Sequence, residues 1–335
     1  MLYTHIMLPS LSVIIPTRHR PQILRRCLEH LAKQTIASQL EVIVVHDGED
    51  DEATAAIFEK NSQYPIPDTQ YIRIAKSQQG IARNRGVERA TAPIVLFLDD
   101  DIFLDPHACE VHLRVRQGLG IGVLGMGEEE KTHASRNPKS EVRIPNPQSP
   151  IPPIAVLGFL TWDPAVGITP VMRWLEKTGW ELGYRRIERF AHAFLPPAIQ
   201  HRFTYTGQLS IPRAIALAHP FTEAATVYGW EDILWGTKLR EGGIRLFYAP
   251  DARGLHHQKM NMEDSLLRMR KIGRALREMR EREPTFDRIP RGGKLLAYRL
   301  AALLPTMGGK HRKALLNGLL TARHPAPESF DDSLA

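Results

Sequence analysis

The chain of 335 residues is 43% hydrophobic and 24% charged, a composition that is typical of a soluble globular protein and excludes disorder throughout. The net charge is +7, and Leu266–Arg323 alone contributes +11 from 15 Lys/Arg and 4 Asp/Glu, so the rest of the chain carries −4. Because nucleic-acid-binding proteins usually have a basic folded domain, no nucleic acid is expected as ligand. We expect a cytoplasmic protein, because the sequence shows no signal peptide, no apolar run of about 18 residues, and no zinc or disulfide spacing at Cys27 and Cys109.

The first hundred residues alternate short apolar runs with amphipathic stretches. The apolar runs predict strands at 11–15, 41–45, 71–74 and 94–98. The stretches between them predict helices at 20–34, 51–61 and 80–90. This alternation is typical of an α/β protein with a mostly parallel sheet and helices on both faces, in which ligands bind at the carboxyl ends of the strands.

Polar residues follow three of the four predicted strands. "PTRHR" follows the first, "HDGEDD" the second and "DDD" the fourth, and Arg83, Asn84 and Arg85 lie in the helix before the fourth. Because the carboxyl ends of parallel strands meet at one edge of a sheet, we expect these groups to gather there.

The second half of the chain is less regular. Glu128–Pro153 is rich in charged residues, Pro, Asn and Ser, which predicts a loop. Trp162, Trp174 and Trp180 are expected to pack a local core, although exposed aromatic side chains there could line a substrate groove. Residues 203–213 predict a strand, and residues 228–258 predict a turn, a helix ending at a Gly-Gly pair, a strand and a histidine pair.

Three consecutive carboxylates, Asp99, Asp100 and Asp101 (the Asp triplet), end the fourth predicted strand. Like charges repel and lose hydration at an enclosed strand end, so a cation is expected beside them. With a second acidic pair at Glu231–Asp232 and a histidine nearby, oxygen ligands favour Mg²⁺ or Mn²⁺ that also binds a diphosphate. The alternative is a calcium-binding or merely acidic loop.

Six stretches, in this order, resemble the family 2 glycosyltransferases of GT-A fold: "LSVIIPTRHRPQILRRCLEHLAKQT", "EVIVVHDGEDD", "GIARNRGVERATAPIVLFLDDDIFLDP", "TGQLSIPR", "GWEDILWGTKLREGG" and "PDARGLHH". The resemblance covers about Leu11–Gln258. It implies a GT-A domain at 1–262, with a Rossmann-like nucleotide-binding half at about 9–127 and an acceptor half at about 150–262. Residues 263–335 then form a basic helical extension.

The resemblance also implies roles for individual residues. Asp232 resembles the catalytic base, and Glu231 would help to hold the acceptor. Asp101 resembles the metal ligand, with His256 or His257 as the late metal or phosphate ligand. The remaining positions resemble donor-binding residues, at Pro16, Thr17, Arg18, Asp47, Gly80, Arg83, Asn84, Asp99, Asp100, Gly207 and Gln208. Gln208 departs from the Asn that is common in the family, and His46 precedes Asp47 where a small residue is common.

Each role has a structural alternative. Asp47 could cap a turn, since Asp-Gly favours turns, and Arg83 could lie on the surface of an amphipathic helix. Glu231 and Asp232 could complement a helix dipole, and one of the two histidines could be structural.

The implied reaction moves a sugar from a nucleoside diphosphate sugar, most simply a UDP-sugar, to a hydroxyl of a glycan or lipid-linked acceptor, with Mn²⁺ or Mg²⁺ and inversion. A nucleotidyltransferase would have a Gly-rich phosphate loop in place of "IPTRHRP", and a dehydrogenase would have GxGxxG after the first strand. A third reading is a non-enzymatic basic module that binds membrane or nucleic acid.

The C-terminal extension alternates apolar and basic residues at helical spacing. Such helices can lie on an anionic membrane surface, which would place the protein peripherally on the inner face of a membrane. Alternatively, they pack on the catalytic domain with a solvated basic face.

Overall fold

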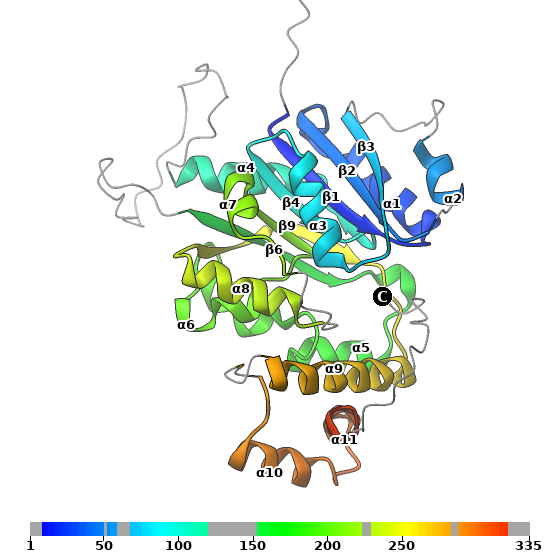
Figure 1. Ribbon diagram of the computed structural model, residues 1–335, viewed down its shortest axis with the longest axis vertical. Coiled ribbons are helices and arrows are strands. Elements are labelled where there is room, and N and C mark those ends of the chain that lie inside the picture. The colour runs from blue at the N-terminus through cyan, green and yellow to red at the C-terminus, as the bar shows by residue number, and fades with distance from the viewer. Residues whose placement is uncertain are drawn as a thin grey trace, which may run out of the picture.

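The computed structural model describes residues 9–49, 52–58, 68–119, 153–222, 229–282, 286 and 288–320. Within them a nine-stranded sheet has the order β3-β2-β1-β4-β8-β6-β9-β5, and β7 pairs with β9 (Figure 1). The strands are β1 (Leu11–Thr17), β2 (Leu40–Asp47), β3 (Asp68–Ile74), β4 (Ile94–Leu98), β5 (Ile102–Leu104), β6 (Ile154–Trp162), β7 (Ala193–Phe194), β8 (Gln208–Pro212) and β9 (Arg245–His256).

The first four strands are parallel neighbours, as the sequence predicts. Every residue of β1, β2 and β4 is buried, which explains why these strands read as continuous apolar runs. Helix α1 (Pro21–Ala32) buries one apolar stripe, and α3 (Gln79–Arg89) packs on β1 and β2. The predicted helix at 51–61 is described only at α2 (Glu52–Ala55) and a short 3-10 turn after it, and its end lies outside the described residues.

The other half of the sheet is mixed. β8 pairs antiparallel with β4 and β6, and β9 runs parallel to β6 but antiparallel to β5 and β7. The predicted strand at 203–213 is thus shorter than expected, and α7 (Arg213–Ala218) follows it. Helix α8 (Glu231–Glu241) is confirmed, and the chain leaves it through Gly243 with φ of +76°. The predicted loop at 128–153 lies outside the described residues except for Pro153.

Helices α4 (Ala108–Gly118), α5 (Pro170–Thr178) and α6 (Pro197–Gln200) flank this half. Trp162 is 1% exposed and packs with Met172 and Met260, as the local-core reading predicts. Trp174 and Trp180 are half-buried and contact His311.

Three helices form a C-terminal layer: α9 (Met262–Arg282), α10 (Gly292–Ala301) and α11 (Met307–Leu320). In Figure 1 this layer, coloured gold to red, lies at the opposite end of the molecule from β1–β3. A Cβ on Gly273 of α9 would lie 2.1 Å from the carbonyl oxygen of Leu315, so glycine allows α9 and α11 to pack closely. Arg268 pairs with Glu181 at 3.0 Å and Trp230 donates to the Ile272 carbonyl, which ties α9 to the body. No helix of the described residues is both long and apolar enough to cross a membrane.

Candidate active site

The Asp triplet directly follows β4, and Arg20 pairs with two of its carboxylates. The Arg20 guanidinium donates to Asp100 and lies 3.2 Å from Asp101 Oδ2. Thr17 Oγ1, at the end of β1, donates to Asp100 Oδ2 at 2.7 Å. The cation expected beside the triplet is therefore supplied, in this structure, by an arginine that follows the neighbouring strand.

Asp100 and Asp101 differ in what their carboxylates can offer. Asp100 is fully buried and its two oxygens are bonded to Thr17 and Arg20, so it supports these residues and presents no free face to a ligand. Burial raises its pKa to about 7 against the opposing effect of Arg20. Burial would also raise the pKa of Asp101, but His256 and Arg20 outweigh it and hold that pKa well below its usual range. The permanent negative charge therefore lies on Asp101.

His256, at the end of β9, is brought to the triplet. Its Nε2 lies 3.5 Å from Asp101 Oδ2, and its ring stacks on Trp162. Burial disfavours the imidazolium, but the Asp101 charge and hydrogen bond outweigh this and raise the pKa of His256. His257 is not brought to the same place. Its Nδ1 lies 2.6 Å from Asp163 Oδ2, and its Nε2 is 2.8 Å from Arg26.

Arg83 connects the triplet to the second acidic pair. It is 1% exposed, so it is not the surface residue of the alternative reading. One of its nitrogens lies 2.7 Å from Asp99 Oδ1, and another lies 3.9 Å from Asp232 Oδ1. Asp99 has the most open side chain of the triplet, 32% exposed. A Cβ at Gly207 would lie 3.1 Å from Asp99 Oδ2, so a bare backbone there lets the chain pass close to this carboxylate.

Asp232, in the first turn of α8, is held by Thr206. The Thr206 hydroxyl donates to Asp232 Oδ1 at 2.6 Å and its backbone N–H donates to Oδ2 at 3.1 Å. Burial raises the pKa of Asp232, whereas Arg83 and the two Thr206 bonds act in the opposite direction. An oriented carboxylate with a raised pKa is suited to accept a proton.

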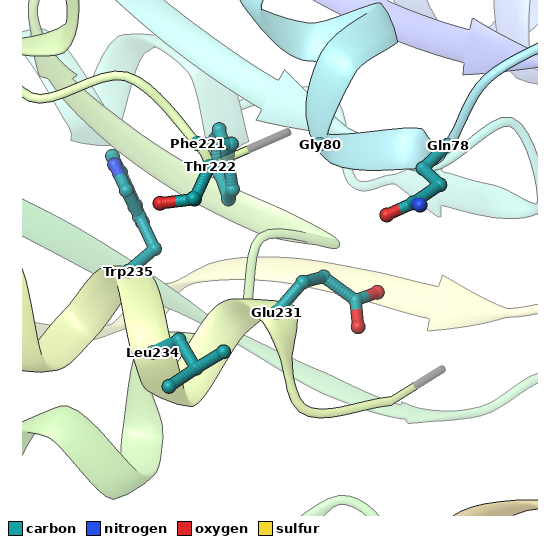
Figure 2. A pocket seen from close by; sticks show the side chains of 7 residues that line it. All are labelled: Gln78, Gly80, Phe221, Thr222, Glu231, Leu234 and Trp235. Atoms are coloured by element: carbon teal, nitrogen blue, oxygen red, sulfur yellow. The ribbon is translucent and has the colours of Figure 1, made fainter. Parts of the chain in front are cut away.

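Glu231 lies beside Asp232 and lines a small pocket (Figure 2). Burial, and then the Asp232 charge, raise the pKa of Glu231 to about 7, and its Oε2 has no hydrogen-bond partner among the described residues. Figure 2 shows the Glu231 carboxylate and the Gln78 amide directed toward the same space from opposite sides. The full lining is Gln78, Gly80, Phe221, Thr222, Glu231, Leu234 and Trp235.

Two of the predicted donor-binding residues, Asn84 and Gly80, contact Phe221 at this pocket. Asn84 forms two hydrogen bonds with the backbone of Phe221, one donated and one accepted, each of 2.9 Å. Gly80 packs against the Phe221 ring, where an added Cβ would lie 3.0 Å from the Phe221 Cβ. They therefore join α3 to the segment before α8.

Asp47 ends β2 and binds the loop before α3. Its Oδ1 accepts from the backbone N–H of Ser77 at 2.5 Å and from the Ser77 hydroxyl at 3.0 Å. Pro16, Thr17 and Arg18 lie at the end of the adjacent β1. Asp47 therefore lies at the predicted edge of the sheet, and its carboxylate fastens a loop 30 residues away.

Gln208 contributes backbone to this edge of the sheet, since it pairs with Leu98 directly before the Asp triplet. Its side chain is fully buried in the sheet, and its Nε2 donates to the Ala252 carbonyl at 3.0 Å.

A divalent cation fits this site only with ligands from the substrate. In the part of the chain that the structure describes, no group of three or more His, Cys, Asp or Glu side chains is arranged to hold a metal. Asp101 and His256 provide one carboxylate and one imidazole 3.5 Å apart. Mg²⁺-type sites with few protein ligands complete their shell with phosphate oxygens and water, so these two residues fit a metal that binds together with a diphosphate.

Sequence reasoning missed two residues of the site, Arg20 and Thr206, and also missed Asp163 as the partner of His257. Arg20 lies in the "PTRHR" stretch, so its position after the first strand was a usable signal. Thr206 and Asp163 contact their partners 26 and 94 residues away, and no local pattern indicates such contacts.

Comparison with known proteins finds glycosyltransferases. The family model described as Glycosyl transferase family 2 matches residues 12–126. A putative glycosyltransferase of Bacillus subtilis, EpsH, is 33% identical over 108 residues, which are 32% of this chain and 30% of that protein. The validoxylamine A glucosyltransferase of Streptomyces hygroscopicus subsp. limoneus is 28% identical over 255 residues, 74% of this chain and 51% of that protein. The chain spans about half or less of the length of these curated relatives.

Solved structures share the fold at low identity. The mannosyltransferase PcManGT from Pyrobaculum calidifontis, in complex with GDP-Man and Mn²⁺, superimposes with a TM-score of 0.53 at 14% identity, covering 94% of this chain and 77% of that one. TarS of S. aureus gives a TM-score of 0.50 at 16% identity, covering 92% of this chain and 48% of that one. The predicted GT-A fold is thereby confirmed, and residues 12–126 are similar to glycosyl transferase family 2.

Proposed function

We propose that the protein is a metal-dependent inverting glycosyltransferase that moves a sugar from a nucleoside diphosphate sugar to an acceptor hydroxyl. The observation that carries this proposal is Arg83, which lies 2.7 Å from Asp99 and 3.9 Å from Asp232. One buried guanidinium thus joins the residues proposed to bind the donor to the proposed base. The nucleotide sugar bound by the mannosyltransferase neighbour supports the choice of donor class.

The acceptor hydroxyl gives its proton to Asp232. The acceptor oxygen forms a bond to the anomeric carbon while the bond from that carbon to the diphosphate oxygen breaks, and its electron pair leaves with the nucleoside diphosphate. One base and one displacement invert the configuration at the anomeric carbon. Thr206 keeps both oxygens of Asp232 oriented for this step.

Asp101 and His256 are the residues that would hold Mn²⁺ or Mg²⁺. When bound, such an ion supplies positive charge that stabilises the departing diphosphate. Arg20 keeps the Asp101 carboxylate in place and ionised. We further propose a UDP-sugar as donor, and as acceptor a glycan or a lipid-linked substrate at the side of Glu231.

A thermal-shift experiment tests the donor site. UDP, GDP, ADP and CDP are added with Mn²⁺, with Mg²⁺ or with EDTA, and at least one should raise the melting temperature more with metal, because a ligand that binds only the native state stabilises it. Asp101→Ala should abolish the metal-dependent part. Asp105→Ala, at an exposed aspartate of the same segment, is the control and should keep it. The proposal fails if no nucleoside diphosphate gives a metal-dependent shift.

A further inference from the structure

Helix α10 is apolar on two faces, and only one of them is covered. Leu295, Tyr298 and Ala302 pack against the cluster formed by α9 and α11. A helix that packs on a protein body normally has one apolar stripe and a polar opposite face. The second apolar face of α10 therefore needs a separate explanation.

The uncovered face consists of four leucines. Their exposed fractions are 59% for Leu296, 59% for Leu300, 81% for Leu303 and 55% for Leu304. After α10 the chain continues in a helical turn, because the N–H groups of Leu303 and Leu304 donate to carbonyls three residues earlier. Successive members of the set are four, three and one residues apart, and on a helix this spacing places all four on one side. We call these four residues the Leu face. The other large apolar side chains that are exposed in the described residues are Leu217 and Leu320.

The surroundings of the Leu face are positively charged. From residue 288 to residue 323 the sequence contains eight Lys/Arg and no Asp/Glu. Arg299 is exposed and lies three residues after Leu296 and four before Leu303, which places it beside the Leu face on the helix surface. Lys310 and Lys313 are exposed on the adjacent α11. A surface that combines apolar side chains with net positive charge is complementary to anionic lipid headgroups over acyl chains.

The position and composition of the Leu face favour a bilayer over a protein partner. In Figure 1, α10 lies at the extreme end of the C-terminal layer, away from the sheet. The apolar side chains of the face are all leucine, whereas the buried centre of a protein interface is enriched in aromatic residues and Met. Binding to an anionic bilayer requires an apolar surface flanked by basic residues, and the α10 region has both features.

We infer that α10 and the turn after it dock the protein on an anionic membrane surface, with the Leu face inserted among the headgroups and Arg299, Lys310 and Lys313 near lipid phosphates. Both interpretations of the C-terminal extension, membrane binding and packing on the catalytic domain, then apply to different helices. α9 and α11 pack on the body and on each other, and α10 is the membrane-contacting element. This inference does not depend on the donor site.

Vesicle flotation of the full chain tests it. Vesicles of phosphatidylcholine with 30 mol% phosphatidylglycerol should bind the protein, and pure phosphatidylcholine should bind it at least about tenfold more weakly, since roughly 1 kcal/mol per basic residue corresponds to about fivefold each. The double variant Leu296→Asp/Leu300→Asp should lower binding at least about tenfold. Leu217→Asp, at a leucine that is 42% exposed on α7, is the control and should bind like the wild type.

A second variant separates charge from apolar insertion. Arg299→Gln/Lys310→Gln should weaken binding to the anionic vesicles by about an order of magnitude and leave the weak binding to neutral vesicles unchanged. All variants should keep the wild-type melting temperature, because the altered side chains are exposed.

Three results would overturn the inference. The wild type could remain unbound with both vesicle types, or the Leu296/Leu300 variant could bind as well as the wild type. Alternatively, sedimentation velocity without lipid could show a dimer that this variant converts to a monomer, and the Leu face would then belong to an interface between two copies of the chain. None of these results bears on nucleotide binding, so they leave the proposed function standing.

Discussion

The molecule has two acidic regions that are built differently, although Arg83 touches both. In the Asp triplet, each carboxylate has a guanidinium within 3.2 Å, from Arg20 or Arg83. At the start of α8, Asp232 lies 3.9 Å from Arg83 and is otherwise held by the neutral Thr206. The first region is rich in paired charge, and the second is poor in it.

This difference changes what the carboxylates can do. His256 and Arg20 hold the pKa of Asp101 below its usual range, so its charge is permanent and suited to binding cations. Burial raises the pKa values of Glu231 and Asp232, so their carboxylates hold a proton more readily. We therefore propose ligand binding at Asp101 and proton transfer at the pair.

The largest expected effect comes from removing the proton acceptor of the pair. Asp232→Asn keeps the shape of the side chain but cannot serve as a base, so transfer should fall by on the order of a hundred- to ten-thousandfold. The rate is measured as release of nucleoside diphosphate from the donor, with water or an added acceptor as the attacking hydroxyl. Nucleotide binding with metal should remain.

Glu231→Gln is the matched control for this variant, since the two residues are neighbours on the first turn of α8. It should cost less, and mainly in the affinity for the acceptor. If Asp232→Asn no longer binds nucleotide, Asp232 is a donor-binding residue and not the base. The two acidic regions would then not differ in function.

A smaller effect is expected from Thr206, which is fully buried and therefore acts as a positioning residue. Thr206→Val removes the 2.6 Å hydroxyl bond to Asp232 but keeps the backbone N–H bond. We expect about a tenfold loss in kcat with little change in KM, since a hydrogen bond to a charged group contributes roughly 1.5–3 kcal/mol and only part of it is lost.

The pH profile separates positioning from a packing defect. A lost bond to the ionised form raises the pKa of the base, so the acidic limb of the Thr206→Val rate profile should move to higher pH. Thr206→Ser should restore both the rate and the profile. Equal defects in the Val and Ser variants would show that the hydroxyl does not hold the base.

The sequence predicted which residues lie at the carboxyl ends of the strands better than it predicted which side chains contact one another there. Strands β1, β2 and β4 are built on apolar runs, and the polar residues that follow them were found because local order determines where a strand ends. The partner of each carboxylate was not predictable. Arg20 reaches the triplet 80 and 81 residues away, and which of several arginines does so depends on the packing of α1 against the sheet.

The same limit applies to the direction of individual side chains. His256 ends β9 and His257 follows it, and the alternation of side chains directs the first to Asp101 and the second to Asp163. Gln208 matches the order of the family motifs, yet as the first residue of β8 its side chain enters the sheet interior. In each case the motif predicted the position along the chain and not the direction of the side chain.

The smallest expected effect concerns the pH dependence of stability. Burial raises the pKa of Glu231 from its ordinary value of 4.5 to about 7, so the folded protein holds a proton that the unfolded chain releases. The resulting stabilisation is complete below about pH 4.5 and is lost as the pH rises through about 7. Glu231→Gln resembles the protonated form at every pH. Its melting temperature relative to the wild type should therefore rise by about 1–3 °C between pH 5 and pH 8.

Glu241→Gln provides the control at the other end of α8, where the Glu241 side chain is 66% exposed. This variant should follow the wild type across the same pH range. If the two variants behave alike, Glu231 is not held in a proton-retaining environment. Glu231 would then resemble Asp101 as a permanently charged group, and Asp232 alone would carry the difference between the two regions.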